Sequence, residues 1–360
     1  MKKNYLFLVG FLSLFLASCT NTNPDVSSSV DIESVVSSKS IFLPEESSAE
    51  VEVLSVEAYF PFEADVAYSY AGDGNEYVSY QKYPQYYEKN RIQYVTKNAG
   101  SHFIEVLELE EGAITQVFRR DETYFRENML GQTRDESSTI LLKEPLEIGN
   151  NWDNSEITAL DIEIETTVGT FPSLEVTTTE KDTITKRYYA EGIGLVKEIY
   201  TDTNGSYEMT ATLESREEGA AETVVLPTYY PDRNVMGLEV AEVNISFFTN
   251  DVTRKVIAEL FKHIPGVDYG QVIPEGTQIK SLYLNEDGRV YVDFSQELVS
   301  DLNAGSSAEK LLLQSIVNTI GSYYGVEEVV LTVENAPYKS GHIEMNEGES
   351  FYVEMNSVLE

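Results

Sequence analysis

The feature that most constrains the fold is a long stretch, residues 51–216, in which apolar and charged residues alternate. Val, Ile, Thr and Tyr are interleaved with charged side chains in segments such as RIQYVTK (91–97) and DIEIETTVGT (161–170). A period of two residues is typical of antiparallel strands with one solvated face. Glu111-Gly112 and Asn204-Gly205 lie between such segments, where hairpin turns need residues that tolerate positive φ. We predict an antiparallel β domain over residues 51–216, built as a sheet, a sandwich or a half-barrel.

The pattern changes after this stretch. Residues 217–236 contain two prolines and a cluster of small residues, which predicts a linker. Residues 241–248 alternate as a strand, and a helix follows, with Asp251 as its N-cap and Pro265-Gly266 after its end. Four apolar residues recur at four-residue spacing and predict the buried stripe of that helix: Val252, Val256, Leu260 and Ile264.

The rest of the chain predicts a hairpin, a second helix and a last strand. Asp287-Gly288 marks the hairpin turn, Ser306 and Glu309 have the spacing of a capping box, and Gly325 suits the position after the helix. The expected apolar face of this helix consists of Leu312, Leu313, Ile316, Val317 and Ile320. Residues 237–360 are therefore predicted as a β-α-β-β-α-β domain with helices packed on a sheet.

The N-terminus has the layout of an export signal. Lys2 and Lys3 precede an apolar run of about 13 residues, whereas a membrane-spanning helix needs roughly 20. The run ends in Leu16-Ala17-Ser18-Cys19, which resembles the lipobox of bacterial lipoproteins. The resemblance implies cleavage of a signal peptide, residues 1–18, and a diacylglycerol on the thiol of Cys19. The alternative is an ordinary signal peptide with an incidental cysteine.

Composition restricts what the exported chain can contact. Residues 19–50 are rich in Ser and acidic residues, so we predict a disordered tether. The formal net charge of −36 repels phosphate backbones and anionic headgroups, which argues against nucleic-acid binding. Membrane contact is therefore expected through the lipid on Cys19. The lipobox resemblance therefore implies a lipid-anchored protein on the outer face of the bacterial cytoplasmic membrane.

The C-terminal part is similar to the GerMN domain family, named for a lipoprotein of spore formation and germination. The similarity covers about residues 241–346 and is carried by three segments: IPEGTQIKSLYLNEDGRVYVDFSQEL (273–298), GSSAEKLLLQSIVNTIGSYYGVEEVVLTVEN (305–335) and GHIEMN (341–346). It implies a fold like the ring-building motifs of export machines, no catalysis, and protein–protein assembly. More weakly, LLKEPLEIGNNW (141–152) and RYYAEGIGLVKEIY (187–200) resemble a module of other lipoproteins from spore-forming bacteria.

Candidate residues for chemistry are few. His102, His263 and His342 are widely separated, and none has the spacing of metal ligands. The chain has no H-E-x-x-H, paired C-x-x-C, G-x-S-x-G or P-loop motif. Asp293 is predicted to end a strand and cap the residues that follow. We predict a non-enzymatic chain without catalytic, cofactor-binding or metal-binding residues, and therefore without a cofactor.

Other acidic side chains have ordinary explanations. Alternating carboxylates are expected on the solvated face of a strand, namely Asp161, Glu163 and Glu165. A calcium loop at Asp73, Asn75 and Glu76 stays open as an alternative, although most of the required spacing is missing.

Tyrosines between residues 68 and 87 suggest either cross-strand packing, the favoured explanation, or an interface through Tyr83, Tyr86 and Tyr87.

Taken together, the sequence predicts a lipid-anchored envelope protein with a protein partner, without a small-molecule ligand. One alternative is a receptor for a small ligand or cell-wall glycan in the Tyr-rich β domain, which a deep aromatic-lined cleft would favour. Another is a hydrolase, which requires converging titratable groups in one pocket.

Overall fold

The computed structural model describes residues 54–359. The predicted signal peptide (1–18), the tether (19–50) and Cys19 lie outside the described residues. Within residues 54–359, no helix has the length and apolar character needed to cross a membrane. Strands dominate this part of the chain, and they are mostly antiparallel, as the alternating sequence predicts.

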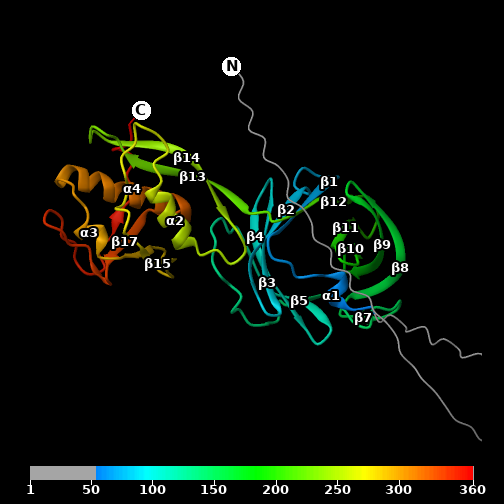
Figure 1. Ribbon diagram of the computed structural model, residues 1–360. Coiled ribbons are helices and arrows are strands. Elements are labelled where there is room, and N and C mark those ends of the chain that lie inside the picture. The colour runs from blue at the N-terminus through cyan, green and yellow to red at the C-terminus, as the bar shows by residue number, and fades with distance from the viewer. Residues whose placement is uncertain (1–53, 360) are drawn as a thin grey trace, which may run out of the picture. The chain divides into compact units, whose positions relative to one another are not determined.

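The N-terminal domain is one 12-stranded antiparallel sheet (Figure 1). Its strands follow the order β6-β5-β4-β3-β2-β1-β12-β11-β10-β9-β8-β7. They are β1 (Val66–Asp73), β2 (Tyr80–Glu88), β3 (Arg91–Asn98), β4 (His102–Glu110), β5 (Ala113–Asp121), β6 (Thr139–Lys143), β7 (Asn151–Trp152), β8 (Ser155–Thr166), β9 (Gly169–Thr179), β10 (Thr183–Ala190), β11 (Gly194–Asp202) and β12 (Glu208–Glu218). The predicted turns occur at positive φ, with Gly112 at 67° and Gly205 at 65°.

The sheet curls until its two edge strands approach each other. In Figure 1, strands β3–β5 and β8–β11 face one another across an interior. The indole N–H of Trp152 on β7 donates to the carbonyl of Ile140 on β6 (3.0 Å), and Asn150 Nδ2 donates to the carbonyl of Lys143 (2.9 Å). The short helix α1 (Val56–Tyr59), which the sequence analysis missed, packs near β11. The result is a half-barrel whose seam is held by side chains.

Strand periodicity gives the half-barrel two different faces. On β3, Tyr94 and Thr96 share the inner face, because they pair with Pro84 and Lys82 of β2 and with Glu105 and Phe103 of β4. The residues that alternate with them along β3, Gln93, Val95 and Lys97, therefore point to the outer face. Each strand supplies the interior with one set of side chains and the outer surface with another.

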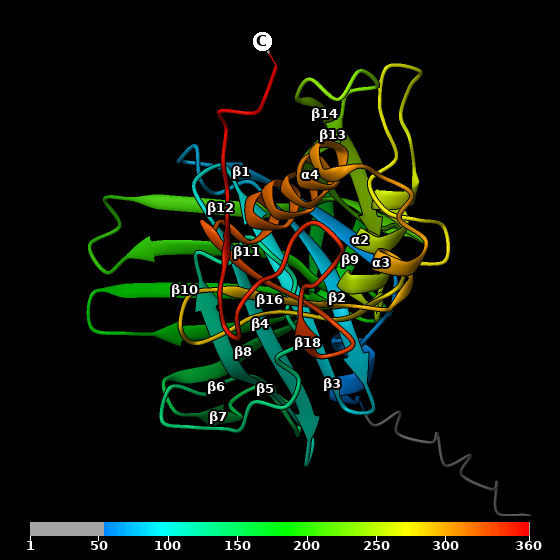
Figure 2. The same ribbon diagram turned by 90° about the vertical axis from the view of Figure 1, so that its left-hand side faces the viewer.

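The C-terminal part begins with a hairpin of β13 (Glu222–Pro231) and β14 (Leu238–Phe247). The elements that follow are α2 (Thr253–Lys262), β15 (Ile279–Leu284), β16 (Val290–Phe294), α3 (Glu297–Ser300), α4 (Ser306–Tyr324), β17 (Glu328–Val333), β18 (Ala336–Pro337) and β19 (Phe351–Tyr352). β16 and β17 pair in parallel, and α4 contacts both this sheet and β13 (Figure 2). One apolar core joins the hairpin, the helices and the sheet.

The structure differs from the predicted linker and from the predicted strand arrangement. Residues 217–236, expected as a linker, hold β13, and only Gly219, Ala220 and Ala221 separate β12 from β13. β14 pairs with β13 instead of joining the sheet of β15, β16 and β17. Prolines 227 and 231 fit β13 because this strand belongs to a two-stranded ribbon, where one edge makes no ladder hydrogen bonds.

The helix details are partly corrected. Asp251 does not cap α2, since its carboxylate accepts the N–H of Phe248 (2.8 Å). Of the predicted stripe, Leu260 is buried and Val256 packs against the core, as predicted, whereas Val252 and Ile264 are each 41% exposed. α2 also buries Ile257 and Phe261. Ser306 and Glu309 form no capping box, and Gly305 is the N-cap of α4. The predicted apolar face of α4 is buried, and Gly325 ends the helix at φ 68°, as predicted.

Replacing Gly325 tests this helix end. Gly325→Ala should lower the free energy of unfolding by about 1 kcal/mol, because a Cβ is strained at left-handed φ even though no atom lies within 4 Å of it. Gly341→Ala is the control, since Gly341 has equally open surroundings without positive φ. Urea unfolding measures both variants. Equal stabilities would contradict the assignment of Gly325.

Candidate functional site

The interior of the half-barrel contains a cavity of about 300 Å³. Its lining combines aromatic rings, hydroxyls and charged groups. The side chains that define it are Phe60, Tyr68, Tyr70, Tyr80, Lys82, Tyr94, Phe103, Glu105, Arg119, Arg187, Tyr189 and Glu198. We call it the barrel cavity. A cleft of this aromatic character is the observation expected for the receptor alternative.

Strand register brings these residues together. Tyr70 of β1 lies opposite Tyr80 of β2, and the two rings stack with centroids 4.5 Å apart at 22°. Tyr94 of β3 lies opposite Glu105 of β4. From the other half of the sheet, Arg187 of β10 pairs with Glu198 of β11. Residues more than 100 positions apart thus face one interior because each occupies the inward position of its strand.

The charges in the barrel cavity are paired. Lys82 Nζ lies 2.7 Å from Glu105 Oε1, and Arg187 Nη2 lies 2.9 Å from Glu198 Oε1. Gln116 Nε2 donates to the second oxygen of Glu105 (2.7 Å). Burial opposes ionisation of Glu105, but Lys82 and these hydrogen bonds outweigh it and lower its pKa. Lys82 Nζ also lies 4.3 Å from the ring centroid of Tyr94.

Three tyrosine hydroxyls that line the barrel cavity have no hydrogen-bond partner among the described residues, those of Tyr80, Tyr94 and Tyr189, and the last two belong to buried side chains. Tyr94 and Tyr189 are 2% and 1% exposed, and among the described residues no hydrogen bond reaches either hydroxyl. Neither hydroxyl belongs to the fully enclosed unpaired polar atoms of residues 54–359, so each touches the open space of the cavity. Burial is the main cause that raises both pKa values, and both groups stay protonated.

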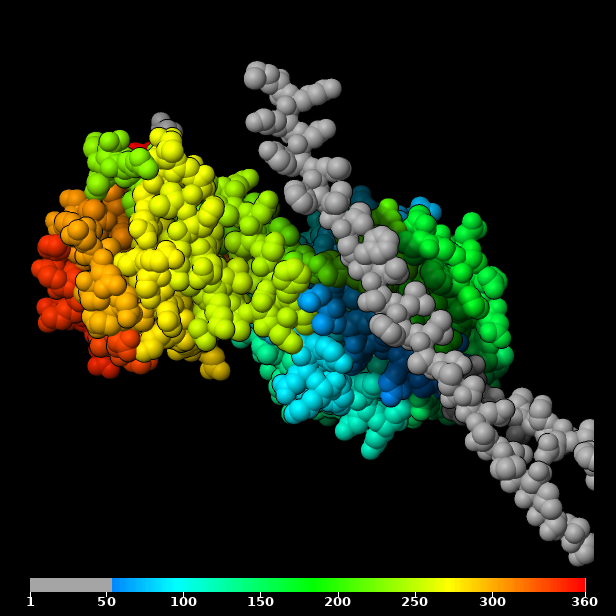
Figure 3. Space-filling view, in the orientation of Figure 1, coloured from blue at the N-terminus to red at the C-terminus, as the bar shows by residue number. Residues whose placement is uncertain are grey.

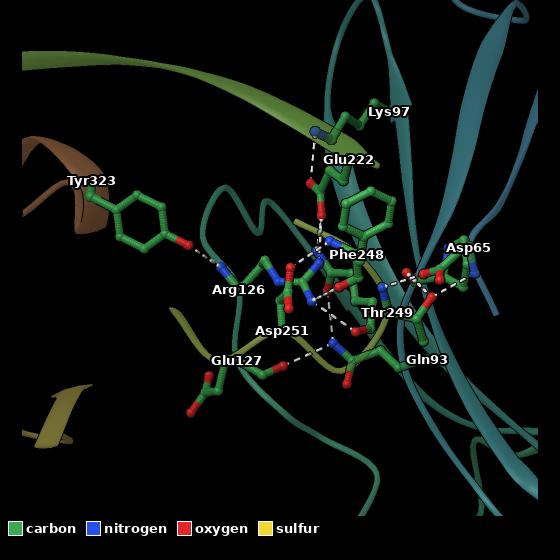
Figure 4. Close-up of polar contacts among 12 residues, drawn as sticks. Asp65, Gln93, Lys97, Arg126, Glu127, Glu222, Phe248, Thr249, Asp251 and Tyr323 are labelled. Atoms are coloured by element: carbon green, nitrogen blue, oxygen red, sulfur yellow. Dashed lines mark hydrogen bonds and ion pairs between the residues drawn. The ribbon is translucent and has the colours of Figure 1, made fainter. Parts of the chain in front are cut away.

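A second polar cluster joins the two domains on the outer face of the half-barrel, and we call it the junction cluster (Figure 4). Its centre is Arg126, from the β5–β6 loop, whose side chain is 1% exposed. Arg126 Nη1 donates to Glu222 Oε2 (3.0 Å), and Nη2 donates to the carbonyl of Gln85 (2.8 Å). The guanidinium lies between the rings of Tyr86 and Phe247, 4.9 and 4.8 Å from their centroids.

Glu222, the first residue of β13, receives three donors in the junction cluster. Lys97 Nζ lies 2.7 Å from Oε1, and Gln85 Nε2 donates to Oε2 (3.0 Å), as does Arg126. Burial disfavours the charged carboxylate, but Lys97 and Arg126 together lower its pKa. The outward positions of β2 and β3 supply Gln85, Gln93 and Lys97, which explains why the cluster lies opposite the barrel cavity.

Backbone contacts extend the junction cluster to the β14–α2 loop. Thr249 Oγ1 accepts the N–H of Asp65 (2.8 Å), and Asp65 Oδ1 accepts the N–H of Thr249 (2.7 Å). Asn250 exchanges two hydrogen bonds with the backbone of Tyr87 (2.9 and 3.0 Å). The N–H of Arg126 donates to the hydroxyl of Tyr323 on α4 (3.1 Å).

The three histidines lie in separate places. His102 packs against Tyr124, and burial is the main cause that lowers its pKa. His263 is the C-cap of α2, where its N–H donates to the carbonyls of Glu259 and Leu260. His342 Nδ1 lies 2.8 Å from Glu309 Oε2 on α4. Over residues 54–359, no group of three His, Cys, Asp or Glu residues is arranged to hold a metal ion.

The acidic candidates are placed as follows. Asp293 is buried near the end of β16, where Oδ1 accepts Thr332 Oγ1 and the N–H of Asn335, both at 2.7 Å. It therefore caps the β17–β18 turn, not the residues directly after it. The strand carboxylates are exposed: Asp161, Glu163 and Glu165. Asp73, Asn75 and Glu76 are exposed in a turn, where Asp73 accepts the N–H of Gly74 and Asn75 that of Tyr77.

The three tyrosines of the predicted interface do not form one exposed surface. Tyr86 is buried against Arg126, and Tyr87 packs edge-on against Phe62, so both rings have internal partners. Tyr83 is partly exposed, with Lys97 5.6 Å from its ring centroid. The sequence analysis missed Arg126 and Glu222. A lone arginine in a long loop and a glutamate that precedes the prolines of the predicted linker form no recognisable local pattern.

Breaking the Arg126–Glu222 pair should destabilise the protein strongly. Glu222→Gln should lower the free energy of unfolding by about 3 kcal/mol, because Arg126 would stay buried without its counter-charge. Glu344→Gln removes one partner of an exposed pair with Lys339 and should change it by less than about 0.5 kcal/mol. Guanidinium unfolding compares the two. A similar loss for both variants would contradict the role of Glu222.

The contribution of Glu222 should also depend on pH. Its folded pKa lies below the ordinary value of 4.5, so its stabilising effect is present above pH 4.5 and is lost as pH falls through the folded pKa. The difference in unfolding free energy between wild type and Glu222→Gln should therefore be largest at neutral pH and shrink below pH 4.5. Urea unfolding over a pH series measures it; a difference that grows on acidification would be inconsistent.

Comparisons with known proteins gave one family model and several solved structures. Among curated proteins, no sequence match was found. A candidate exported protein with a YmcC-like fold from Bacteroides fragilis NCTC 9343 is 13% identical over 44% of this chain and 99% of that chain, with a TM-score of 0.31. A candidate lipoprotein from Parabacteroides distasonis ATCC 8503 is 14% identical over 44% of this chain and 98% of that chain, with a TM-score of 0.33.

Another solved structure is the first GerMN domain of the sporulation protein GerM from Bacillus subtilis. It is 19% identical over 35% of this chain and 97% of that chain, with a TM-score of 0.26. The model of the Germane family, described as sporulation and spore germination, matches residues 227–339. This match confirms the resemblance seen in the sequence, and the chain therefore carries a C-terminal domain of the Germane family, from β13 to β18.

Proposed function

We propose that this protein is a lipoprotein of the bacterial cell envelope whose Germane domain binds a partner protein during sporulation or germination. A diacylglycerol on Cys19 holds it at the outer face of the cytoplasmic membrane. The observation that carries the proposal is the Germane match over residues 227–339, a family described by sporulation and spore germination. The lipobox-like Leu16-Ala17-Ser18-Cys19 supports the anchor. We assign no reaction to the chain.

The anchor would act by raising local concentration. Two acyl chains hold a protein stably on a bilayer, whereas one chain gives only reversible binding. Confinement to the membrane face then strengthens contacts that are weak in solution, because the second contact becomes effectively intramolecular. A net charge of −36 gives no attraction to anionic headgroups, so the lipid would supply the membrane affinity.

A groove in the Germane domain is the contact surface that we favour. It has a volume of about 760 Å³ and lies between the β13–β14 turn, the α2–β15 segment and the α3–α4 segment. Figure 3 shows the last two side by side, in yellow and orange. Val235 and Ile264 line the groove and are 39% and 41% exposed. Met236 and Val267, which lie close to them in the sequence, are 77% and 73% exposed. Apolar side chains gathered at a surface are typical of protein contacts.

The sheet edge beyond Val333 is a less accessible contact surface than the groove. β18 pairs with β17 at Thr332 and Val333, and β19 pairs with β17 at Glu328 and Val329. Short strands of this kind cover an edge that would otherwise accept a strand from another chain. The groove is therefore the better candidate.

Lipidation is tested in the native host with a labelled fatty acid. Cys19→Ala should lose the label and move from the membrane fraction to the soluble fraction, because Cys19 is the single cysteine of the chain. Ser18→Ala keeps a small residue before the cysteine and should keep the label. Equal labelling of Cys19→Ala and the wild type would refute the anchor.

The partner surface is tested by crosslinking in sporulating cells of the native host. Val235→Glu combined with Ile264→Glu should reduce the yield of the principal crosslinked complex by about ten-fold, because charges would enter an apolar contact. Val168→Glu makes the same change at an exposed apolar residue of the half-barrel and should leave the yield unchanged. If the double variant crosslinks as well as the wild type, the groove is not the contact surface.

A further inference from the structure

We propose that the barrel cavity binds a small neutral ligand rich in hydroxyl groups, of the carbohydrate class. This site lies in the half-barrel and does not depend on the function proposed for the Germane domain. Its volume of about 300 Å³ falls at the lower end of the range for small-molecule sites, roughly 300–1,000 Å³. A ligand of mono- or disaccharide size fits that range, and a longer glycan would need to extend out of the cavity.

The aromatic walls suit the apolar face of a sugar ring. Tyr70 and Tyr80 form a stacked pair, and the rings of Tyr94, Tyr189 and Phe60 complete much of the lining. Sugar rings expose C–H groups on one face and hydroxyls around the rim, so they pack on flat aromatic surfaces while keeping their polar edges free. Tyrosine adds a polar tip to the same apolar body.

The charges argue for a neutral ligand. Lys82 pairs with Glu105, and Arg187 pairs with Glu198, so each buried charge already has its counter-charge. Arg119 lies on the ring of Phe103, 3.7 Å from its centroid, and pairs with Asp121 (2.8 Å). An ionic ligand would lose its hydration without meeting an unpaired opposite charge, which is unfavourable. The paired groups still offer N–H donors and carboxylate lone pairs to uncharged hydroxyls.

The unpaired hydroxyls define what the ligand must offer. Tyr94 and Tyr189 are nine-tenths buried or more, line the barrel cavity, and have no hydrogen-bond partner among the described residues. Buried polar atoms almost always have a partner. A phenolic hydroxyl both donates and accepts, and so does an alcohol, which makes a ligand with several hydroxyls a complementary partner.

The experiment is calorimetric titration of the full-length Cys19→Ala protein with glucose, N-acetylglucosamine and cellobiose. Their charged analogues, glucuronic acid and glucosamine, are titrated in parallel. We expect saturable binding of at least one neutral sugar, and binding of the charged analogues about ten-fold weaker or more. Tyr94→Phe and Tyr189→Phe should each weaken that binding about five-fold, because each variant removes one hydrogen-bonding hydroxyl and keeps the ring.

Tyr77→Phe is the control, since Tyr77 is 51% exposed and does not line the barrel cavity. Thermal unfolding of each variant separates lost binding from lost folding, because Tyr→Phe keeps the packing volume. The proposal is overturned by no saturable binding of any neutral sugar up to about 10 mM, which would mean a cavity that holds water alone. Preference for a charged analogue, or Tyr94→Phe and Tyr189→Phe variants that bind like the wild type, would also overturn it.

Discussion

The two-residue period of strands β2 and β3 places the barrel cavity and the junction cluster on opposite faces of the sheet. Successive side chains of β3 alternate between the interior and the outer surface, so Tyr94 and Thr96 line the barrel cavity while Gln93 and Lys97 face the junction cluster. A shift of one residue in the pairing of β2 with β3 would exchange these sets. The same register therefore specifies an aromatic interior and a surface that receives the Germane domain.

The junction cluster shows how the chain tolerates buried charge. A lone guanidinium or carboxylate in this position would be strongly unfavourable, since desolvation of each ion costs several kcal/mol. The ion pair between Arg126 and Glu222 offsets this desolvation. Lys97 and Gln85 also bind the carboxylate of Glu222, and the rings of Tyr86 and Phe247 contact the guanidinium of Arg126. Because Arg126 belongs to the half-barrel and Glu222 begins β13, these contacts require both the half-barrel and the β13–β14 hairpin to be folded.

Local patterns in the sequence were sufficient for much of the fold. The β domain, its glycine turns and the apolar face of α4 follow from residues that are neighbours in sequence, as does Gly325 at φ 68°. The capping box failed because distant residues compete for a side chain. Glu309 has capping-box spacing, but its carboxylate accepts Tyr338 Oη (2.7 Å) and pairs with His342 instead. The barrel cavity could not be predicted for the same reason, because its ion pairs and stacked rings depend on the register of separate strands.

The seam of the half-barrel gives the protein an optical reporter. The chain has a single tryptophan, and Trp152 is 5% exposed at the point where β7 reaches β6. Indole emission shifts to longer wavelength when water reaches the ring. Fluorescence from this one side chain therefore monitors separation of the two sheet edges without a label, while the Germane domain, which has no indole, stays silent.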